Sequence, residues 1–313
     1  MSGLSETAVP IPTPGRRAGP AVVACTDGLP PLLPGLAYLG AALTGRPAHT
    51  FADGLLPWVE DEARVLLAAE RSAVPIAPLT SRRSGLTLAD AYRIQWAGAA
   101  LRIRDGARPI GHKVGLTSAA MREQMGIDEP DSGLLLDDMV VPCGGELAVA
   151  GLVSPRIETE FAFRLGRDLS GAEVDLTDAR RSVDEVMVAL EVIDTRYRDW
   201  RITLPDSIAD NAACARIVTG PPTPFHTGTD LRELVVNVDI DGRPAASGAG
   251  KEILGDPIAS VAWLARRLAS FGTGLKAGDL VLAGSVHASL PLLPGTRVRA
   301  RCEGLPPVDL RTV

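Results

Sequence analysis

The feature that most constrains the fold is a change in the apolar pattern at about Pro109. Before this residue the apolar side chains recur at helical spacing, and after it they form short runs typical of strands. The expected strands do not alternate regularly with helices, which argues against a doubly wound parallel sheet. The expected strands are Ile110–Val114, Leu134–Leu136, Ile157–Leu165, Val186–Ile193, Ile217–Thr219, Leu234–Ile240, Leu280–Ala283 and Thr296–Arg301, with one helix at about Pro257–Phe271.

The chain before Pro109 divides into two parts. An amphipathic helix is expected from about Leu56 to Glu70, and a second helix begins after Leu86, with Thr87 as N-cap and Asp90 as its capping partner. Residues 1–50 are rich in Pro, Gly and Ala without periodicity, which indicates a poorly structured extension or an upstream start outside the functional fold. We therefore expect three parts, at 1–50, 51–108 and 109–313.

The composition is typical of a soluble globular protein and excludes several classes. Of 313 residues, 46% are apolar and 22% charged, and the net charge of −6 argues against a nucleic-acid-binding protein. The four cysteines show no paired spacing, which favours a reducing, cytoplasmic compartment over a disulfide framework or zinc site. Export through a signal after Arg16-Arg17 is the alternative, but Asp27 and nearby prolines interrupt the apolar stretch. No membrane-spanning segment is expected.

Two carboxylates share one face of an expected strand. Glu158 and Glu160 are two residues apart, so their side chains point to the same side. Adjacent like charges repel unless they are solvated or bridged by a cation. The segment is therefore either a solvent-facing sheet edge or part of a metal site.

A third carboxylate interrupts an apolar strand. Glu191 lies within Val186–Ile193, where an unpaired charge would cost several kcal/mol. Its partner is either an arginine, such as Arg196 or Arg156, or a divalent cation. Three carboxylates with open water positions suit Mg²⁺ or Mn²⁺.

A lysine lies between apolar residues in Ile110–Val114. Lys113 either extends outward to solvent or reaches into a cleft to meet a substrate carboxylate. His112 points to the opposite face, and we interpret it as structural.

These segments together resemble one family. The resemblance runs from about residue 55 to the C-terminus, and its motifs follow one another in the same order. It is similar to the 2-keto-4-pentenoate hydratase and 4-oxalocrotonate decarboxylase group of the fumarylacetoacetate-hydrolase-like superfamily. The matching segments are Gly-His-Lys-Val-Gly-Leu-Thr-Ser (111–118), Gly-Ile-Asp-Glu-Pro-Asp-Ser-Gly (126–133), Leu-Asp-Asp-Met (136–139), Pro-Arg-Ile-Glu-Thr-Glu (155–160), Leu-Glu-Val-Ile-Asp (190–194), Arg-Asp-Trp (198–200), Ala-Asp-Asn-Ala (209–212) and Leu-Ala-Gly-Ser (282–285).

The resemblance implies a fold and an assembly. It implies an α+β protein with a mixed β-sandwich or roll, a smaller helical N-terminal part and a homo-oligomeric state. Residues 109–313 would then be the catalytic domain.

The resemblance also implies roles for individual residues. Glu158, Glu160 and Glu191 would hold Mg²⁺ or Mn²⁺. Lys113 would anchor the substrate or transfer a proton, with Asp138 nearby. Arg156 and Asp210 flank matched motifs and are expected to support substrate binding.

Two positions depart from the family pattern. Ser132 replaces an aromatic residue, which we expect to enlarge or hydrate the neighbouring volume. The loop after Ser285 carries His287, which is either a proton-transfer group at the pocket or a surface histidine. Both positions, together with Ser285, are therefore candidate substrate-binding residues.

The implied activity is the addition of water to a 2-hydroxy-2,4-dienoate, giving a 4-hydroxy-2-oxo acid. The main alternative is a 2-oxo-3-hexenedioate (4-oxalocrotonate) decarboxylase, and a biosynthetic member acting on another 2-oxo acid is a further possibility. A hydrolase of an acylpyruvate would need a water-activating dyad, for which His287 is the one candidate. A purely structural subunit would have no reason to keep a buried acid such as Glu191.

Overall fold

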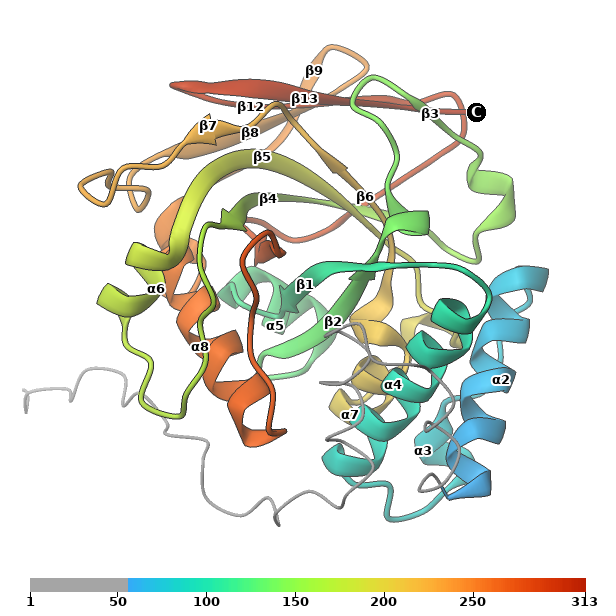
Figure 1. Cartoon of the computed structure of the whole chain (residues 1–313). Helices are drawn as coiled ribbons and strands as arrows, with labels where there is room; N and C mark the ends of the chain where they lie inside the picture. The colour runs from blue at the N-terminus through green and yellow to red at the C-terminus, as the bar shows by residue number, and fades with distance from the viewer. Residues whose placement is uncertain (1–55) are drawn as a thin grey trace, which may run out of the picture. The chain divides into compact units, whose positions relative to one another are not determined.

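Two β-sheets form the centre of the computed structural model, which describes residues 56–313 (Figure 1). The larger sheet has the order β2-β1-β10-β4-β5-β6, with β11 paired to β4 and β7 paired to β5. Its strands are β1 (Pro109–Gly115), β2 (Asp131–Leu136), β4 (Arg156–Leu165), β5 (Val183–Ile193), β6 (Cys214–Thr219), β7 (Thr223–Pro224), β10 (Leu280–Ser285) and β11 (Leu290–Pro291).

The smaller sheet has the order β3-β13-β12-β8-β9 and contacts β5 through β12 and β13. Its strands are β3 (Glu146–Leu147), β8 (Val235–Ile240), β9 (Arg243–Ala249), β12 (Arg297–Cys302) and β13 (Leu305–Thr312). Both sheets are mixed, because β1 pairs in parallel with β10 and β3 pairs in parallel with β13, while the other pairs are antiparallel. The predicted α+β class with mixed sheets is confirmed.

The two helices that the periodicity predicts before Pro109 correspond to α2 and α4, and a short helix, α3, lies between them in the described residues. α4 starts with the expected capping box: the Thr87 side chain accepts a hydrogen bond from Asp90 N, and the Asp90 carboxylate accepts one from Thr87 N. α2 and α4 pack together, and α4 also packs on α7. The helices are α2 (Pro57–Ser72), α3 (Leu79–Arg82), α4 (Leu88–Arg104), α5 (Ala119–Met125), α6 (Leu176–Ser182), α7 (Leu204–Ala209) and α8 (Pro257–Ser270).

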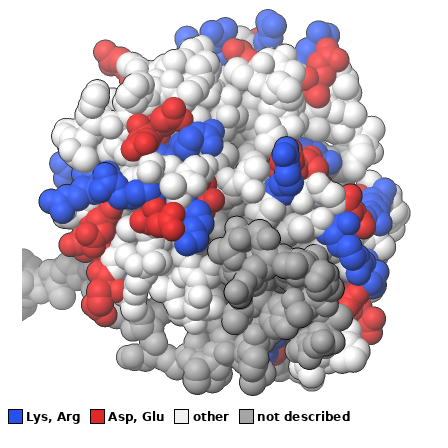
Figure 2. Space-filling model, in the orientation of Figure 1, with Lys and Arg blue, Asp and Glu red and all other residues white. Residues whose placement is uncertain are grey.

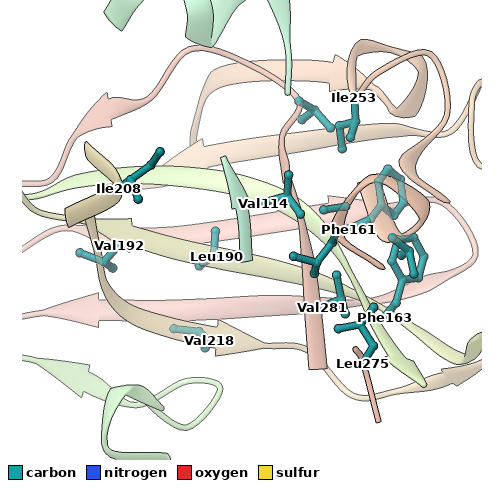
Figure 3. Close-up of a cluster of buried hydrophobic side chains, with 14 of the residues drawn as sticks. Val114, Phe161, Phe163, Leu190, Val192, Ile208, Val218, Ile253, Leu275 and Val281 are labelled. Atoms are coloured by element: carbon teal, nitrogen blue, oxygen red, sulfur yellow. The ribbon is translucent and has the colours of Figure 1, made fainter. Parts of the chain in front are cut away.

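The two faces of β4 and β5 have different environments. On one face, Phe161 and Phe163 of β4 and Leu190 and Val192 of β5 are buried in the main hydrophobic core (Figure 3). The residues that alternate with them include the three glutamates on the opposite face. The core therefore fixes the direction in which the carboxylates point.

The predicted division of the chain is only partly within the described residues. The expected extension at 1–50 lies outside them. All described residues belong to one compact unit, so the boundary between 51–108 and 109–313 stays a prediction. Within residues 56–313, no helix has the length and apolar character needed to span a bilayer.

The visible surface carries charges of both signs. On the face shown in Figure 2, Lys and Arg side chains of the described residues lie beside Asp and Glu side chains and form no continuous basic area.

Candidate metal centre and active site

Three buried glutamates meet in the middle of the larger sheet. Glu158 of β4 pairs directly with Glu191 of β5, and Glu160 follows two residues along β4 on the same face. Their exposed fractions are 3%, 0% and 0% in the order Glu158, Glu160, Glu191. β4 has β10 on one side and β5 on the other, so the alternative of a solvent-facing sheet edge is wrong.

The cluster has buried oxygen atoms that accept no hydrogen bond. Glu160 Oε2 accepts a hydrogen bond of 2.7 Å from Gly284 N, but Glu160 Oε1 and both Glu191 oxygens are buried without a hydrogen bond. One oxygen from each glutamate lies within 4.8 Å of the others. Buried, unpartnered carboxylate oxygens facing one another are the donor set of a hard divalent cation. The cluster could therefore hold a metal ion.

Glu158 and Glu160 hold protons more strongly than ordinary carboxyls do. Burial, with a further contribution from the Glu191 charge, raises the pKa of Glu158 to about 8. The same two causes raise the pKa of Glu160 well above its usual value. The metal-free cluster is therefore partly protonated at neutral pH.

Lys113 is the cationic neighbour of the cluster. Its Nζ lies 3.3 Å from Glu191 Oε1, and its side chain is 4% exposed. Burial alone would lower the pKa of Lys113, but the surrounding carboxylates, first of all Glu191, raise it above its ordinary value. Lys113 therefore reaches inward as an ammonium ion, and it takes the place of the arginine considered as a partner of Glu191.

Asp131 stands beside Lys113, and the sequence analysis missed it. It begins β2 opposite Gly115 of β1, and its Oδ2 accepts a hydrogen bond of 2.6 Å from Ser207 Oγ. Its Oδ1 is buried without a hydrogen bond. Burial raises the pKa of Asp131, and the Lys113 charge opposes this rise. Asp131 is therefore a candidate proton-transfer group.

A narrow pocket joins these polar groups to an apolar wall. Lys113, Asp131 and Glu158 line it together with side chains from α5, from the 3-10 helix η5 (Arg198–Trp200) and from the loops that follow. Met121, Ile193 and Ala213 form a small apolar cluster there, against which Met125 and Trp200 pack. A lining that combines polar and apolar groups suits a small organic acid.

Asp138 does not lie near Lys113, and that prediction needs correction. It belongs to the 3-10 helix η3 (Asp137–Met139), beyond the opposite end of β2, and its side chain is 45% exposed. Its Oδ2 lies 2.8 Å from Nη2 of Arg102 on α4. Asp131, at the start of the same strand, occupies the place expected for Asp138.

Ser132 also points away from the pocket. Strand alternation directs it to the face opposite Asp131, where its Oγ lies 3.2 Å from Tyr92 Oη of α4. The prediction that Ser132 binds substrate therefore needs correction. The hydroxyl pair lies between the sheet and the helix.

His287 is buried on the far side of β4 from the glutamates. Its Nε2 lies 2.9 Å from Thr159 Oγ1, and its Nδ1 lies 2.8 Å from Ala288 O. Burial lowers the pKa of His287. The histidine is thus neither a pocket group nor a surface group. Ser285, opposite Glu160 in the β10–β4 ladder, donates a hydrogen bond of 2.7 Å to His287 O.

Arg156 lies at the margin of the cluster, on the same face of β4 as Glu158. Its Nε donates a hydrogen bond of 2.7 Å to Ser289 Oγ, and Nη2 donates one of 2.5 Å to Ser289 O. Ser289 Oγ in turn donates one of 2.8 Å to Gln124 Oε1 of α5. Arg156 therefore connects the strand of the glutamates to the loop and helix beside the pocket.

Asp210 is a structural partner of Arg196. Its Oδ2 accepts a hydrogen bond of 2.8 Å from Arg196 N and one of 3.1 Å from Thr195 Oγ1, and its Oδ1 accepts one from Arg196 Nε. It lines a separate cavity between α2, α4 and the sheet. The prediction that Asp210 binds substrate therefore needs correction, because its oxygens are already occupied.

The comparisons with known proteins agree with this geometry. Residues 119–313 match the family model for the C-terminal domain of fumarylacetoacetate (FAA) hydrolase. The chain is 37% identical over 250 residues to 2-hydroxyhexa-2,4-dienoate hydratase of Comamonas testosteroni, covering 79% of this chain and 95% of that protein. It is also 37% identical over 245 residues to 4-oxalocrotonate decarboxylase of Pseudomonas putida, covering 78% and 93%.

A solved structure supports the same assignment. 4-oxalocrotonate decarboxylase from Pseudomonas putida G7, complexed with magnesium and adipate, superposes with a TM-score of 0.79 at 34% identity. The match covers 83% of this chain and 99% of that chain. The chain therefore belongs to the fumarylacetoacetate hydrolase family, within the group that contains the 2-keto-4-pentenoate hydratases and the 4-oxalocrotonate decarboxylases.

Proposed function

We propose that the chain is a metal-dependent lyase that adds water to a 2-hydroxy-2,4-dienoate and forms a 4-hydroxy-2-oxo acid. The observation that carries this proposal is the set of buried oxygens on Glu160 and Glu191 that accept no hydrogen bond and lie beside the Lys113 ammonium group. The similarity to a hydratase, which extends over most of both chains, supports the proposed activity.

The metal proposed for Glu158, Glu160 and Glu191 is Mg²⁺ or Mn²⁺. Carboxylate oxygens suit these hard ions, and a related decarboxylase is complexed with magnesium. When bound, such an ion supplies Lewis-acid stabilisation for the negative charge of an enolate oxygen.

Lys113 and Asp131 are the groups of this chain proposed to act on the substrate. Lys113, held as an ammonium ion, offers a positive charge and N–H donors to the substrate carboxylate or to the developing oxyanion. Asp131 has a raised pKa and one unpartnered oxygen, so it can carry a proton to or from carbon. Ser207 orients it through the bond to Oδ2.

The proton balance of hydration requires such groups. The 2-hydroxyl loses its proton and C5 gains one, which converts the dienol into a 2-oxo-3-enoate. A water oxygen then forms a bond to C4, and C3 gains a proton. The two transfers to carbon need a positioned donor, and the pocket limits competing water.

Decarboxylation is the second candidate. A 4-oxalocrotonate decarboxylase of equal sequence identity supports this reaction, and loss of CO₂ from a 2-oxo-3-enedioate needs the same stabilisation of an enolate.

The homo-oligomeric state implied by the family resemblance likewise stays a proposal, which light scattering of the purified chain would test.

A ¹H NMR time course with freshly generated 2-hydroxypenta-2,4-dienoate or 2-hydroxymuconate, in the presence of Mg²⁺ or Mn²⁺, tests the activity. We expect metal-dependent formation of a 4-hydroxy-2-oxo acid, and its loss in Glu191→Gln. Release of CO₂ from the diacid would favour the decarboxylase instead. Turnover that survives both metal removal and Glu191→Gln would contradict the proposal.

A further inference from the structure

The pocket beside the glutamates has one charged end and one apolar end. Its charged and polar lining comes from β1, β2, β4 and α7, where Lys113, Asp131, Glu158 and Ser207 lie. The rest of the lining is largely apolar and comes from α5, η5, β5 and adjoining loops, with Met121, Met125, Ile127, Ile193, Trp200 and Ile202.

A 2-oxo acid can enter this pocket in one productive orientation. Its carboxylate and 2-oxygen belong at the charged end, because that end holds Lys113 and Glu158, the proposed metal ligand that lines the pocket. The remaining carbon chain must then extend toward Met125 and Trp200. Among the described residues, Lys113 is the only cationic side chain that lines the pocket.

Arg156 is the nearby cation that has to be considered as an alternative. It pairs with Ile193 across β4 and β5, but it does not line the pocket, and its Nε and Nη2 are bound to Ser289. A second carboxylate at the substrate's far end would therefore meet apolar side chains. Burying an unpaired carboxylate costs several kcal/mol.

We infer that this chain acts on a 2-oxo or 2-hydroxydienoate acid whose far end is uncharged, and that Met125 and Trp200 determine this specificity. The inference rests on the proposed function, because it uses the proposed metal end to orient the substrate. It goes further by excluding dicarboxylic acids as preferred substrates.

Binding of unreactive acids separates this inference from the proposed function. Isothermal titration calorimetry of the full chain with Mn²⁺ would compare 2-oxohexanoate with 2-oxoadipate, which have equal length and differ in the terminal carboxylate. We expect 2-oxohexanoate to bind about 100-fold more tightly. Pyruvate, which has no tail, would report on the charged end alone.

Two substitutions at one half-buried position provide the matched test. Met125→Lys places a cation at the apolar end, and we expect it to reduce the preference at least about tenfold by strengthening the binding of 2-oxoadipate. Met125→Leu keeps the wall apolar at similar volume, and we expect it to keep the preference.

Three other outcomes of these binding experiments would each overturn a defined part of the inference. Equal or tighter binding of 2-oxoadipate to the unaltered chain would overturn the inference, and its loss in Arg156→Gln would identify Arg156 as the unexpected partner. An unchanged preference in Met125→Lys would overturn the role of Met125. If pyruvate also fails to bind with Mn²⁺, the proposed function fails together with the inference.

Discussion

Gly115 lies directly beside the carboxylate of Asp131, and a β-carbon at position 115 would lie 2.2 Å from Asp131 Oδ1. The same β-carbon would lie 2.9 Å from Lys113 Nζ. Both polar groups therefore occupy the space above this glycine. The missing side chain of Gly115 is what allows Lys113 and Asp131 to approach each other.

Gly115→Ala should remove most of the activity while the fold persists. The added methyl group must displace Asp131 or Lys113, and a misplacement of about 1 Å costs on the order of 100-fold in turnover. Steady-state kinetics and circular dichroism would check this. Gly98→Ala is the control, because the β-carbon added at Gly98 of α4 meets nothing within 4 Å. Equal kinetics of both variants would contradict the prediction.

Asp131 and Asp138 should respond differently to the same substitution. Asp131→Asn removes a proton-transfer group, so we expect turnover to fall about 100-fold or more. Asp138→Asn alters a surface ion pair with Arg102, so we expect turnover within about twofold of the unaltered chain. Measurement of kcat and KM for both variants checks this. A larger loss of turnover in Asp138→Asn than in Asp131→Asn would indicate that Asp138 belongs to the active site.

Metal binding should release protons. Burial and the Glu191 charge raise the pKa of Glu158 to about 8, and a carboxyl must lose its proton before it binds a cation. The affinity for Mn²⁺ should therefore increase between pH 6 and pH 8, by about tenfold per pH unit for each proton displaced. Calorimetry in buffers of different ionisation enthalpy would count these protons. An affinity that does not depend on pH would contradict the raised pKa of Glu158.

The metal-free protein should lose stability over a related pH range. The pKa of Glu158 is raised in the folded chain, so above its ordinary pKa the folded state holds a proton that the unfolded state has released. The free energy of unfolding therefore decreases as the pH rises from about 4.5 to about 8. Thermal unfolding with a chelator should show Tm falling by about 5 °C or more, and Mn²⁺ should reverse the fall. A Glu158→Gln variant should lose part of this pH dependence.

Loss of the ion pair between Arg196 and Asp210 should lower the stability of the fold and leave metal binding unchanged. Asp210→Asn leaves a buried guanidinium without its counter-charge, which should lower the free energy of unfolding by about 3 kcal/mol. Urea unfolding would measure the loss, and calorimetry would show retained Mn²⁺ affinity. Asp230→Asn, in an exposed pair with Arg232, should leave the unfolding midpoint unchanged.

The sequence predicts the elements whose signals are local. The capping box at Thr87 and Asp90 is readable from two residues, and the alternation in β4 is readable from one strand. α5 and α7 were not predicted, because helices of 7 and 6 residues have little periodicity. β13 was also missed, since Pro306 and Pro307 obscure its pattern.

The candidate site was predictable where one strand decides the direction of a side chain. Glu158 and Glu160 share a face because they are two residues apart, whichever strands lie beside them. The place of Asp131 depends on the register of β1 against β2, which pairs Gly115 with Asp131. One sequence does not show that register, so the family resemblance alone leads to Asp138 beside Lys113 and to Ser132 as a substrate-binding residue.

The parallel pairing of β1 with β10 has a consequence for the order in which the chain can fold. The residue paired with Lys113 is Leu282, which the ribosome adds long after β1 and β2 have emerged. Until then β1 has an open edge whose backbone groups lack one partner, and such edges attract other strands. The strand that carries the central lysine is therefore among the last parts of the sheet to be completed during synthesis.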